Sequence, residues 1–106
     1  MAKWIDIGIL SEFPDREKRV VRAEQESLVI CHVDGDLQAV QNVCPHAGMP
    51  IGEGELIGCI LTCPFHGYAY NVKTGKNVDF EDDIPLQRIP VKVESDRVLV
   101  DVEEAE

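Results

Sequence analysis

Short apolar runs alternate with polar positions along most of the chain, and clusters of turn residues separate them. These clusters recur at Pro14-Asp15, Asp34-Gly35-Asp36, Lys73-Thr74-Gly75-Lys76 and Ser95-Asp96. The runs between them are rich in Val, Ile and Leu, and no window repeats apolar residues at the 3.6-residue spacing of a helix. The pattern predicts an all-β domain with at most a single helical turn at residues 11–13.

Two hairpins can be predicted from this pattern. The first joins residues 27–33 to residues 37–40, because Asp34-Gly35 supplies the positive φ that a tight turn needs. The second joins residues 91–94 to residues 98–102, where Val alternates with Lys92 and Glu94 before a Ser-Asp turn and with Leu99 and Asp101 after it. We expect one face of each strand to lie in the core.

Between these hairpins, from about Asn42 to Asn71, the chain is rich in Gly, Pro, Cys and His. Two short motifs stand out, Cys44-Pro45-His46-Ala47-Gly48 and Cys63-Pro64-Phe65-His66-Gly67. Each offers one thiolate and one imidazole, and the glycine close behind each histidine lets backbone N–H groups approach a bound group. The segment is therefore interpreted as an insertion that builds a metal site from Cys44, His46, Cys63 and His66.

The mixing of ligand types within each motif bears on the identity of the metal. A structural zinc site also uses two Cys and two His, but usually draws them from Cys-x₂₋₄-Cys and His-x₃₋₅-His pairs. Here two sulfurs can converge on one metal and two nitrogens on another, which is what a Rieske [2Fe–2S] centre requires. The spacing favours the Rieske centre, and a zinc-stabilised interaction module remains the alternative.

The segment from Asn42 to Val102 resembles the bacterial Rieske-type ferredoxins, the ferredoxin components of ring-hydroxylating dioxygenase systems, and the front third fits them more loosely. The motifs that carry the resemblance are Cys44–Pro50, Gly52-Glu53-Gly54, Thr62–Tyr68 and Asn71–Gly75. The resemblance implies that residues 1–106 form a single Rieske domain. Its fold would be a barrel or sandwich of stacked antiparallel sheets, with a cluster-binding subdomain inserted at about 42–71.

The resemblance also implies the ligands of one [2Fe–2S] cluster per chain. Cys44 and Cys63 would bind the buried iron, and His46 and His66 would bind the outer iron near the surface. In such proteins a third, proline-containing loop covers the cluster, and Asp79–Pro85 stands in the matching place.

The chain departs from the Rieske proteins of respiratory and photosynthetic complexes at several positions. Met49 and Phe65 stand where those proteins carry two disulfide-bonded cysteines, and Tyr68 stands where they carry a serine hydroxyl, whereas Tyr70 matches their tyrosine. Fewer hydrogen bonds to the cluster sulfurs lower the potential. We therefore expect a midpoint in the lower part of the range of about −150 to +300 mV that Rieske centres span.

A saturated cluster leaves no position at which a substrate could bind, so we expect a one-electron carrier and no enzyme activity of the chain alone. The resemblance implies an NAD(P)H-dependent flavin reductase as donor and a terminal oxygenase of the aromatic-ring-hydroxylating type as acceptor. The alternative is a Rieske-like small subunit of an oxidoreductase such as an assimilatory nitrite reductase.

The composition limits the partners further. Ten Lys and Arg against 20 Asp and Glu give a net charge of −10 and an isoelectric point near 4.6, which argues against nucleic acid or an anionic membrane and favours a basic protein partner. The run Glu81-Asp82-Asp83 beside the cluster is the expected place of docking electrostatics. No apolar run is long enough for a signal peptide or a membrane span, so we expect a soluble, cytoplasmic protein. We also expect it to be a monomer.

The two remaining cysteines stand in apolar runs. In the reducing cytoplasm, Cys31 and Cys59 are expected to be small buried hydrophobes, with a disulfide or a redox sensor as the alternative.

Overall fold

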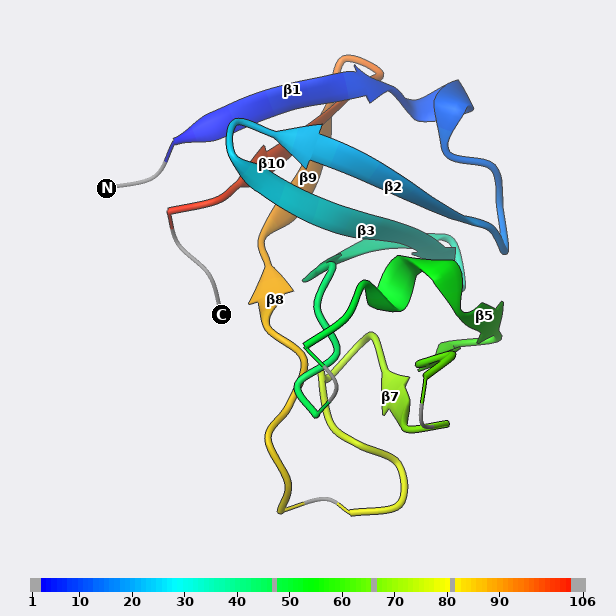
Figure 1. Ribbon diagram of the computed structural model, residues 1–106. Helices are drawn as coiled ribbons and strands as arrows, with labels where there is room; N and C mark the ends of the chain where they lie inside the picture. Colours follow the sequence, from blue (N-terminus) through cyan, green and yellow to red (C-terminus); the bar gives the residue numbers. More distant parts are fainter. Residues whose placement is uncertain (1–2, 47, 66, 81, 104–106) are drawn as a thin grey trace.

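Three small antiparallel sheets make up the computed structural model, which describes residues 3–46, 48–65, 67–80 and 82–103 (Figure 1). The strands are β1 Trp4–Ile9, β2 Lys18–Ala23, β3 Glu26–Val33, β4 Asp36–Gln41, β5 Glu55–Ile57, β6 Ile60–Thr62, β7 Ala69–Asn71, β8 Arg88–Ile89, β9 Val91–Glu94 and β10 Arg97–Asp101. Two short 3₁₀ helices, η1 Leu10–Glu12 and η2 Ile51–Glu53, complete the elements of the described residues. None of the helices in this part of the chain has the length and apolarity to cross a membrane.

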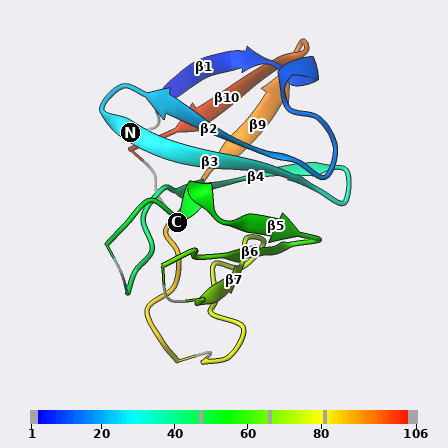
Figure 2. The same ribbon diagram turned by 45° about the vertical axis from the view of Figure 1, so that its right-hand side comes forward.

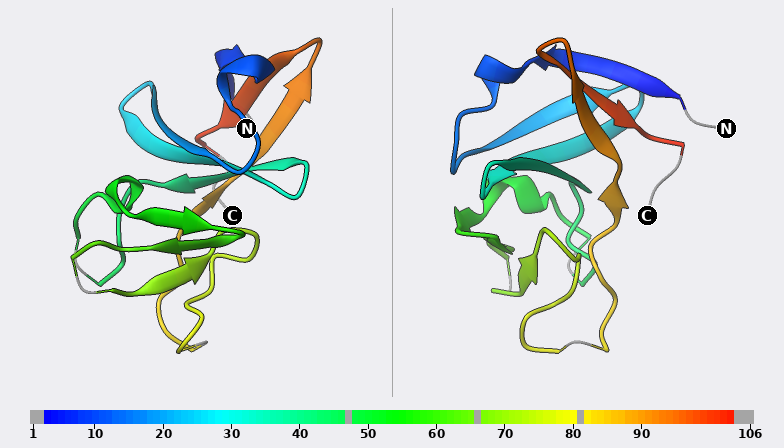
Figure 3. Two further views of the ribbon diagram at one scale, coloured as in Figure 1. Left: turned by 90° about the vertical axis from the view of Figure 1, so that its right-hand side faces the viewer. Right: turned by 180° about the vertical axis from the view of Figure 1, so that it is seen from behind.

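The strand orders are β1-β10-β9, β2-β3-β4-β8 and β5-β6-β7. Figure 2 shows them as layers, with the β2-β3-β4 sheet between the β1-β10-β9 sheet and the small β5-β6-β7 sheet. The views of Figure 3 show that the loop between β7 and β8 projects at the end of the molecule farthest from β1. The predicted all-β fold of stacked antiparallel sheets is confirmed.

Both predicted hairpins are present, as β3-β4 and β9-β10. Asp34 and Gly35 have φ of 52° and 83°, and Ser95 and Asp96 have φ of 48° and 70°. Two consecutive residues with positive φ are the signature of the type I′ turn, whose twist matches that of the strands it joins. The single helical turn, expected at residues 11–13, is η1 and lies one residue earlier.

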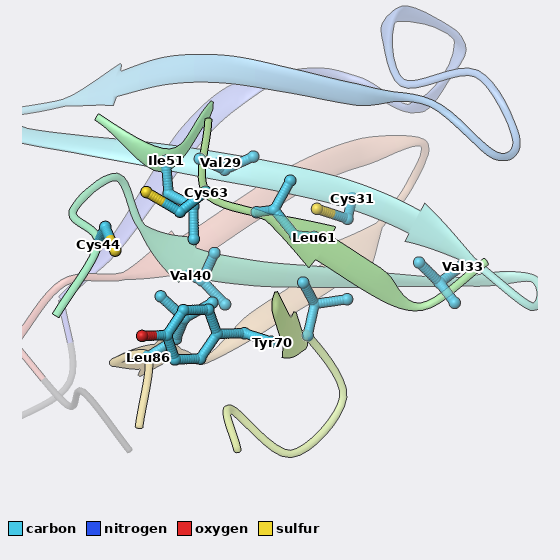
Figure 4. Close-up of a cluster of buried hydrophobic side chains, with 11 residues drawn as sticks. Val29, Cys31, Val33, Val40, Cys44, Ile51, Leu61, Cys63, Tyr70 and Leu86 are labelled. Atoms are coloured by element: carbon cyan, nitrogen blue, oxygen red, sulfur yellow. The ribbon is translucent and has the colours of Figure 1, made fainter. Parts of the chain in front are cut away.

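The core consists of two clusters of buried side chains, and one of them contains both motif cysteines (Figure 4). Its buried members are Val29, Cys31, Val33, Val40, Cys44, Ile51, Leu61, Cys63, Tyr70, Val72 and Leu86. They come from the middle sheet, from the small sheet and from the loops between the two. This cluster therefore fixes the small sheet against the rest of the fold.

The two cysteines outside the motifs also contact this cluster. Cys31 is fully buried, and its burial raises the pKa of the thiol to about 12. Cys59 is partly buried and packs against the same side chains. Both sulfurs are thiols, so the alternative of a disulfide between them is not realised, and Cys31 is the small buried hydrophobe that was expected.

Gly54 is required by the packing of the small sheet. A Cβ at this position would lie 1.7 Å from the carbonyl oxygen of Thr62, the residue before Cys63. We expect Gly54→Ala to lower the free energy of unfolding by about 1–3 kcal/mol, the usual cost of overpacking, as measured by urea denaturation. The control is Gly58→Asn, because Gly58 has a φ of +61° that Asn tolerates, with no atom within 4 Å of its Cβ position. Equal losses in both variants would show that the close approach is unimportant.

Candidate metal centre

The two motif loops have the same backbone hydrogen bonds. The N–H of Cys44 donates to the carbonyl of Met49 at 2.8 Å, and the N–H of Gly48 donates to the carbonyl of Cys44 at 2.8 Å. In the second loop the N–H of Cys63 donates to the carbonyl of Tyr68 at 2.7 Å, and the N–H of Gly67 donates to the carbonyl of Cys63 at 3.0 Å. The loops therefore close in the same way, although their histidines stand two and three residues after the cysteine.

A glycine with positive φ closes each loop. Gly48 has a φ of 66° and Gly67 has a φ of 73°, which is the left-handed region that glycine adopts without steric cost. Each of these glycines follows its cysteine by four residues. The glycines that the sequence places after both histidines therefore have a conformational role in the turn.

Both motif cysteines are fully buried, and they leave the sheets at neighbouring places. Cys63 directly follows β6, and Cys44 follows the end of β4 by three residues. Figure 4 shows both sulfurs and the Tyr70 hydroxyl at the same end of the buried cluster. The structure therefore brings the two motif cysteines to the same end of one buried cluster.

The buried hydroxyl of Tyr70 indicates whether this end of the core suits a cofactor that is bound through sulfur. Its side chain is completely buried, and among the described residues no group accepts a hydrogen bond of normal geometry from its hydroxyl. Burial and the adjacent Cys44 raise the pKa of this phenol, so it is an O–H donor at neutral pH. A buried donor of this kind costs about 1–3 kcal/mol unless an acceptor is present. Ligand or bridging sulfurs of an iron–sulfur cluster are such acceptors, so Tyr70 fits the expected cofactor.

His46 lies at the rim of the site. Its side chain is 28% exposed, and its Nε2 is 2.5 Å from Oδ2 of Asp83. The ring stacks on the ring of Tyr68, with 4.1 Å between the centroids and 15° between the planes. The imidazole is therefore held at one face by Tyr68 and at its outer nitrogen by Asp83.

The fourth predicted site residue, His66, lies outside the described residues, as does Glu81 of the acidic run. In the part of the chain that the structure describes, no three His, Cys, Asp or Glu side chains form a group that could hold one metal ion. Two sulfurs lie in the core and the imidazole of His46 lies at the surface.

Two residues of the site were not predicted in these roles. The carboxylate of Asp83 was expected to be part of an exposed docking run, but it contacts His46. Asn77 is buried, and its Oδ1 accepts hydrogen bonds from the N–H groups of Asp79 at 2.9 Å and Phe80 at 3.1 Å. An Asn that caps its own turn has a local sequence signal, whereas the contact of Asp83 spans 37 residues and has none.

Comparison with known families decides what kind of centre this is. A family model described as the Rieske [2Fe-2S] domain matches residues 3–90. The chain belongs to the Rieske family. The cofactor of this Rieske protein is one [2Fe–2S] cluster, and the zinc alternative is set aside.

Relatives of similar length align with most of the Rieske protein. It is 32% identical over 100 residues to the ferredoxin component of the naphthalene 1,2-dioxygenase system of Pseudomonas aeruginosa, which covers 94% of this chain and 96% of that protein. It is 37% identical over 78 residues to the ferredoxin component of biphenyl 2,3-dioxygenase from Rhodococcus jostii, which covers 74% of this chain and 73% of that protein.

Solved structures of the family have the same fold. A chain in the complex of reduced oxygenase and oxidised ferredoxin of carbazole 1,9a-dioxygenase superposes with a TM-score of 0.83, 30% identity and 92% coverage of both chains. The ferredoxin of Sphingomonas yanoikuyae B1 also gives a TM-score of 0.83, with 29% identity and coverage of 93% of this chain and 98% of that one.

Proposed function

We propose that this Rieske protein is a one-electron carrier that passes electrons from an NAD(P)H-dependent flavin reductase to a terminal oxygenase of the aromatic-ring-hydroxylating type. The observation that carries the proposal is the similarity to the naphthalene dioxygenase ferredoxin component, which extends over 94% of this chain and 96% of that protein. The four cysteine thiols suit a reducing compartment, so we propose that the carrier acts in the cytoplasm.

We further propose that Cys44, His46, Cys63 and His66 hold the cluster, with the sulfurs on the inner iron and the imidazoles on the outer iron. When bound, the cluster accepts one electron and gives it up again. Cys44 and Cys63 exclude water from the inner side, because both side chains are fully buried. His46 provides the route to the surface, because its ring is the described ligand group that solvent reaches.

The surface around His46 supports docking of a protein partner. Exposed apolar side chains stand in all three loops of the site, and we call them the docking tip: Met49, Phe65, Phe80 and Ile84. Large apolar side chains gathered at one end of a small protein are typical of interaction sites. Asp79 and Asp82 are exposed beside them. The expected partner surface is therefore apolar at its centre and basic at its edge.

This arrangement changes the expectation that Glu81-Asp82-Asp83 dominates docking. Of this run, Glu81 lies outside the described residues and Asp83 contacts His46, so Asp82 is the exposed member that the structure describes. We propose that apolar contacts of the docking tip provide most of the affinity, and that the acidic residues mainly steer the encounter.

Truncation of the docking tip tests both the partner and the surface. The dithionite-reduced protein is mixed in a stopped-flow instrument with the oxidised oxygenase component of a naphthalene, biphenyl or carbazole dioxygenase, and the return of the visible absorption is followed. We expect Ile84→Ser to lower the second-order rate constant about fivefold to tenfold, because a buried apolar anchor is worth about 1 kcal/mol or more in an interface.

Ile57→Ser is the matched control. Ile57 is 68% exposed against 63% for Ile84, but it stands at the β5-β6 turn, at the opposite end of the small sheet from the cysteine loops (Figure 2). We expect its rate constant to stay within about twofold of that of the parent, well below the loss at a hot spot. Equal effects of the two variants would contradict the docking tip, and failure of all three oxygenases to reoxidise the parent would contradict the proposed acceptor.

A further inference from the structure

The carboxylate of Asp83 is fixed by two contacts. Its Oδ1 accepts a hydrogen bond from the N–H of Ile84 at 2.8 Å, and its Oδ2 lies 2.5 Å from Nε2 of His46. Only 27% of the Asp83 side chain is exposed, close to the value for His46. An aspartate carboxyl is ionised at neutral pH, so Asp83 presents a negatively charged Oδ2 to the imidazole in a fixed position.

The contact determines which nitrogen of His46 carries the proton. An ionised carboxylate only accepts hydrogen bonds, so Nε2 must be the donor. In a neutral imidazole the other nitrogen, Nδ1, then has the lone pair that a metal needs. The stacked ring of Tyr68 fixes the plane of the imidazole. Together the two neighbours leave His46 with one metal-binding atom in one orientation.

The contact between Asp83 and His46 also joins the loop between β7 and β8 to the first motif loop. Asp83 and His46 are 37 residues apart in the sequence, and the loop between β7 and β8 projects at one end of the molecule (Figure 3). In the first half of this loop, Oδ1 of Asn77 accepts hydrogen bonds from the N–H groups of Asp79 and Phe80. Near its end, Asp83 joins it to the first motif loop. Asp83 thus connects the two loops that flank the exposed edge of the imidazole.

We infer that Asp83 is a positioning residue, whose carboxylate orients His46 toward the cluster and lowers the affinity of the cluster-loaded protein for an electron. The inference rests on the proposed function, in which His46 is a ligand. A carboxylate that accepts the outer N–H of a ligand histidine makes that histidine a stronger electron donor. Its fixed negative charge also opposes the arrival of another one. Both effects favour the oxidised state.

Asp82 provides a matched control. It is the neighbouring residue in the same loop and carries the same charge, but its side chain is exposed, whereas that of Asp83 is held against His46. Asp83→Asn and Asp82→Asn therefore remove the same charge from nearly the same place. They differ in whether a hydrogen bond to His46 is altered.

The test is a spectroelectrochemical titration of the parent and both variants at one pH and at 0.2 M salt, with EPR of the reduced proteins to verify the cluster. We expect Asp83→Asn to raise the equilibrium constant for reduction about fivefold, a shift of about +40 mV at 59 mV per factor of ten. We expect less than about a twofold change for Asp82→Asn, because salt screens exposed charges. Equal shifts in the two variants would overturn the inference.

If Asp83→Asn loses the cluster, Asp83→Glu shows whether the missing carboxylate is the cause, because glutamate keeps that group. A retained cluster and a reduction constant within about twofold of the parent value support a role for the carboxylate. Loss of a polar group that contacts a metal ligand commonly changes metal affinity by more than twofold. A cluster lost in Asp83→Glu as well would overturn the inference. A parent protein without a cluster contradicts the proposed function instead, so the two failures are distinguishable.

Discussion

Cys63→Ser is expected to abolish cluster binding. Cys63 is completely buried in the core that joins the small sheet to the middle sheet, and a serine oxygen is a poor replacement for the soft thiolate that iron–sulfur clusters require. The purified variant should be colourless and iron-free. Because metal binding contributes to folding free energy, its thermal midpoint should fall by several degrees or more, as measured by circular dichroism.

Cys31→Ser is the control for this prediction. Cys31 lies in the same buried cluster and is just as inaccessible, so the exchange places the same hydroxyl in the same core. It should lower stability by about 1–3 kcal/mol, the cost of a poorly satisfied buried polar group, while the iron content stays at the parent value. Iron retained in Cys63→Ser and lost in Cys31→Ser would contradict the proposed ligand set.

Tyr70→Phe should lower the midpoint potential by about 60 mV. The hydroxyl of Tyr70 is buried beside Cys44, and reduction adds negative charge that an O–H donor to sulfur stabilises. Loss of a hydrogen bond to a charged group costs about 1.5–3 kcal/mol. If roughly 1.4 kcal/mol of this applies to the reduced state alone, the reduction constant falls tenfold, which is 59 mV. Protein-film voltammetry measures the shift.

Tyr68→Phe is the comparison for Tyr70→Phe. The ring of Tyr68 stacks on His46, and phenylalanine keeps that ring. We therefore expect its potential to change by less than about 20 mV, a factor of about two in the reduction constant. A larger shift in Tyr68→Phe than in Tyr70→Phe would show that the buried hydroxyl is not the donor to the sulfur. The sign expected for Tyr70→Phe is opposite to that for Asp83→Asn.

The hairpins were predictable because their signals are local. Asp34-Gly35 and Ser95-Asp96 each specify a turn whose flanking strands are adjacent in the sequence. The pairing of β1 with β10 was not predicted, because residues as far apart as Trp4 and Asp101 are brought together only by the folded core. Strand β2 was also missed. The strands β5 and β7 were missed as well, since a run of three residues does not establish a period of two.

In the site, too, the features with a local sequence signal were predicted and those that depend on long-range contacts were not. The cysteines and histidines could be found because each pair stands within one short motif, and the glycine that closes each loop is part of that motif. The contact of Asp83 with His46 could not be found, because one acidic residue of a charged run looks like the next until the loop is folded over the first motif. Polar partners of a site are therefore the part that required the structure.

EPR spectroscopy and metal analysis of the purified protein, before and after reduction with dithionite, test the mixed Cys/His cluster most directly. We expect a red-brown protein with two irons per chain and no zinc, which takes up one electron and then gives a rhombic signal. A colourless protein that holds stoichiometric zinc and gives no signal after reduction would contradict the cluster and the electron-carrier function together.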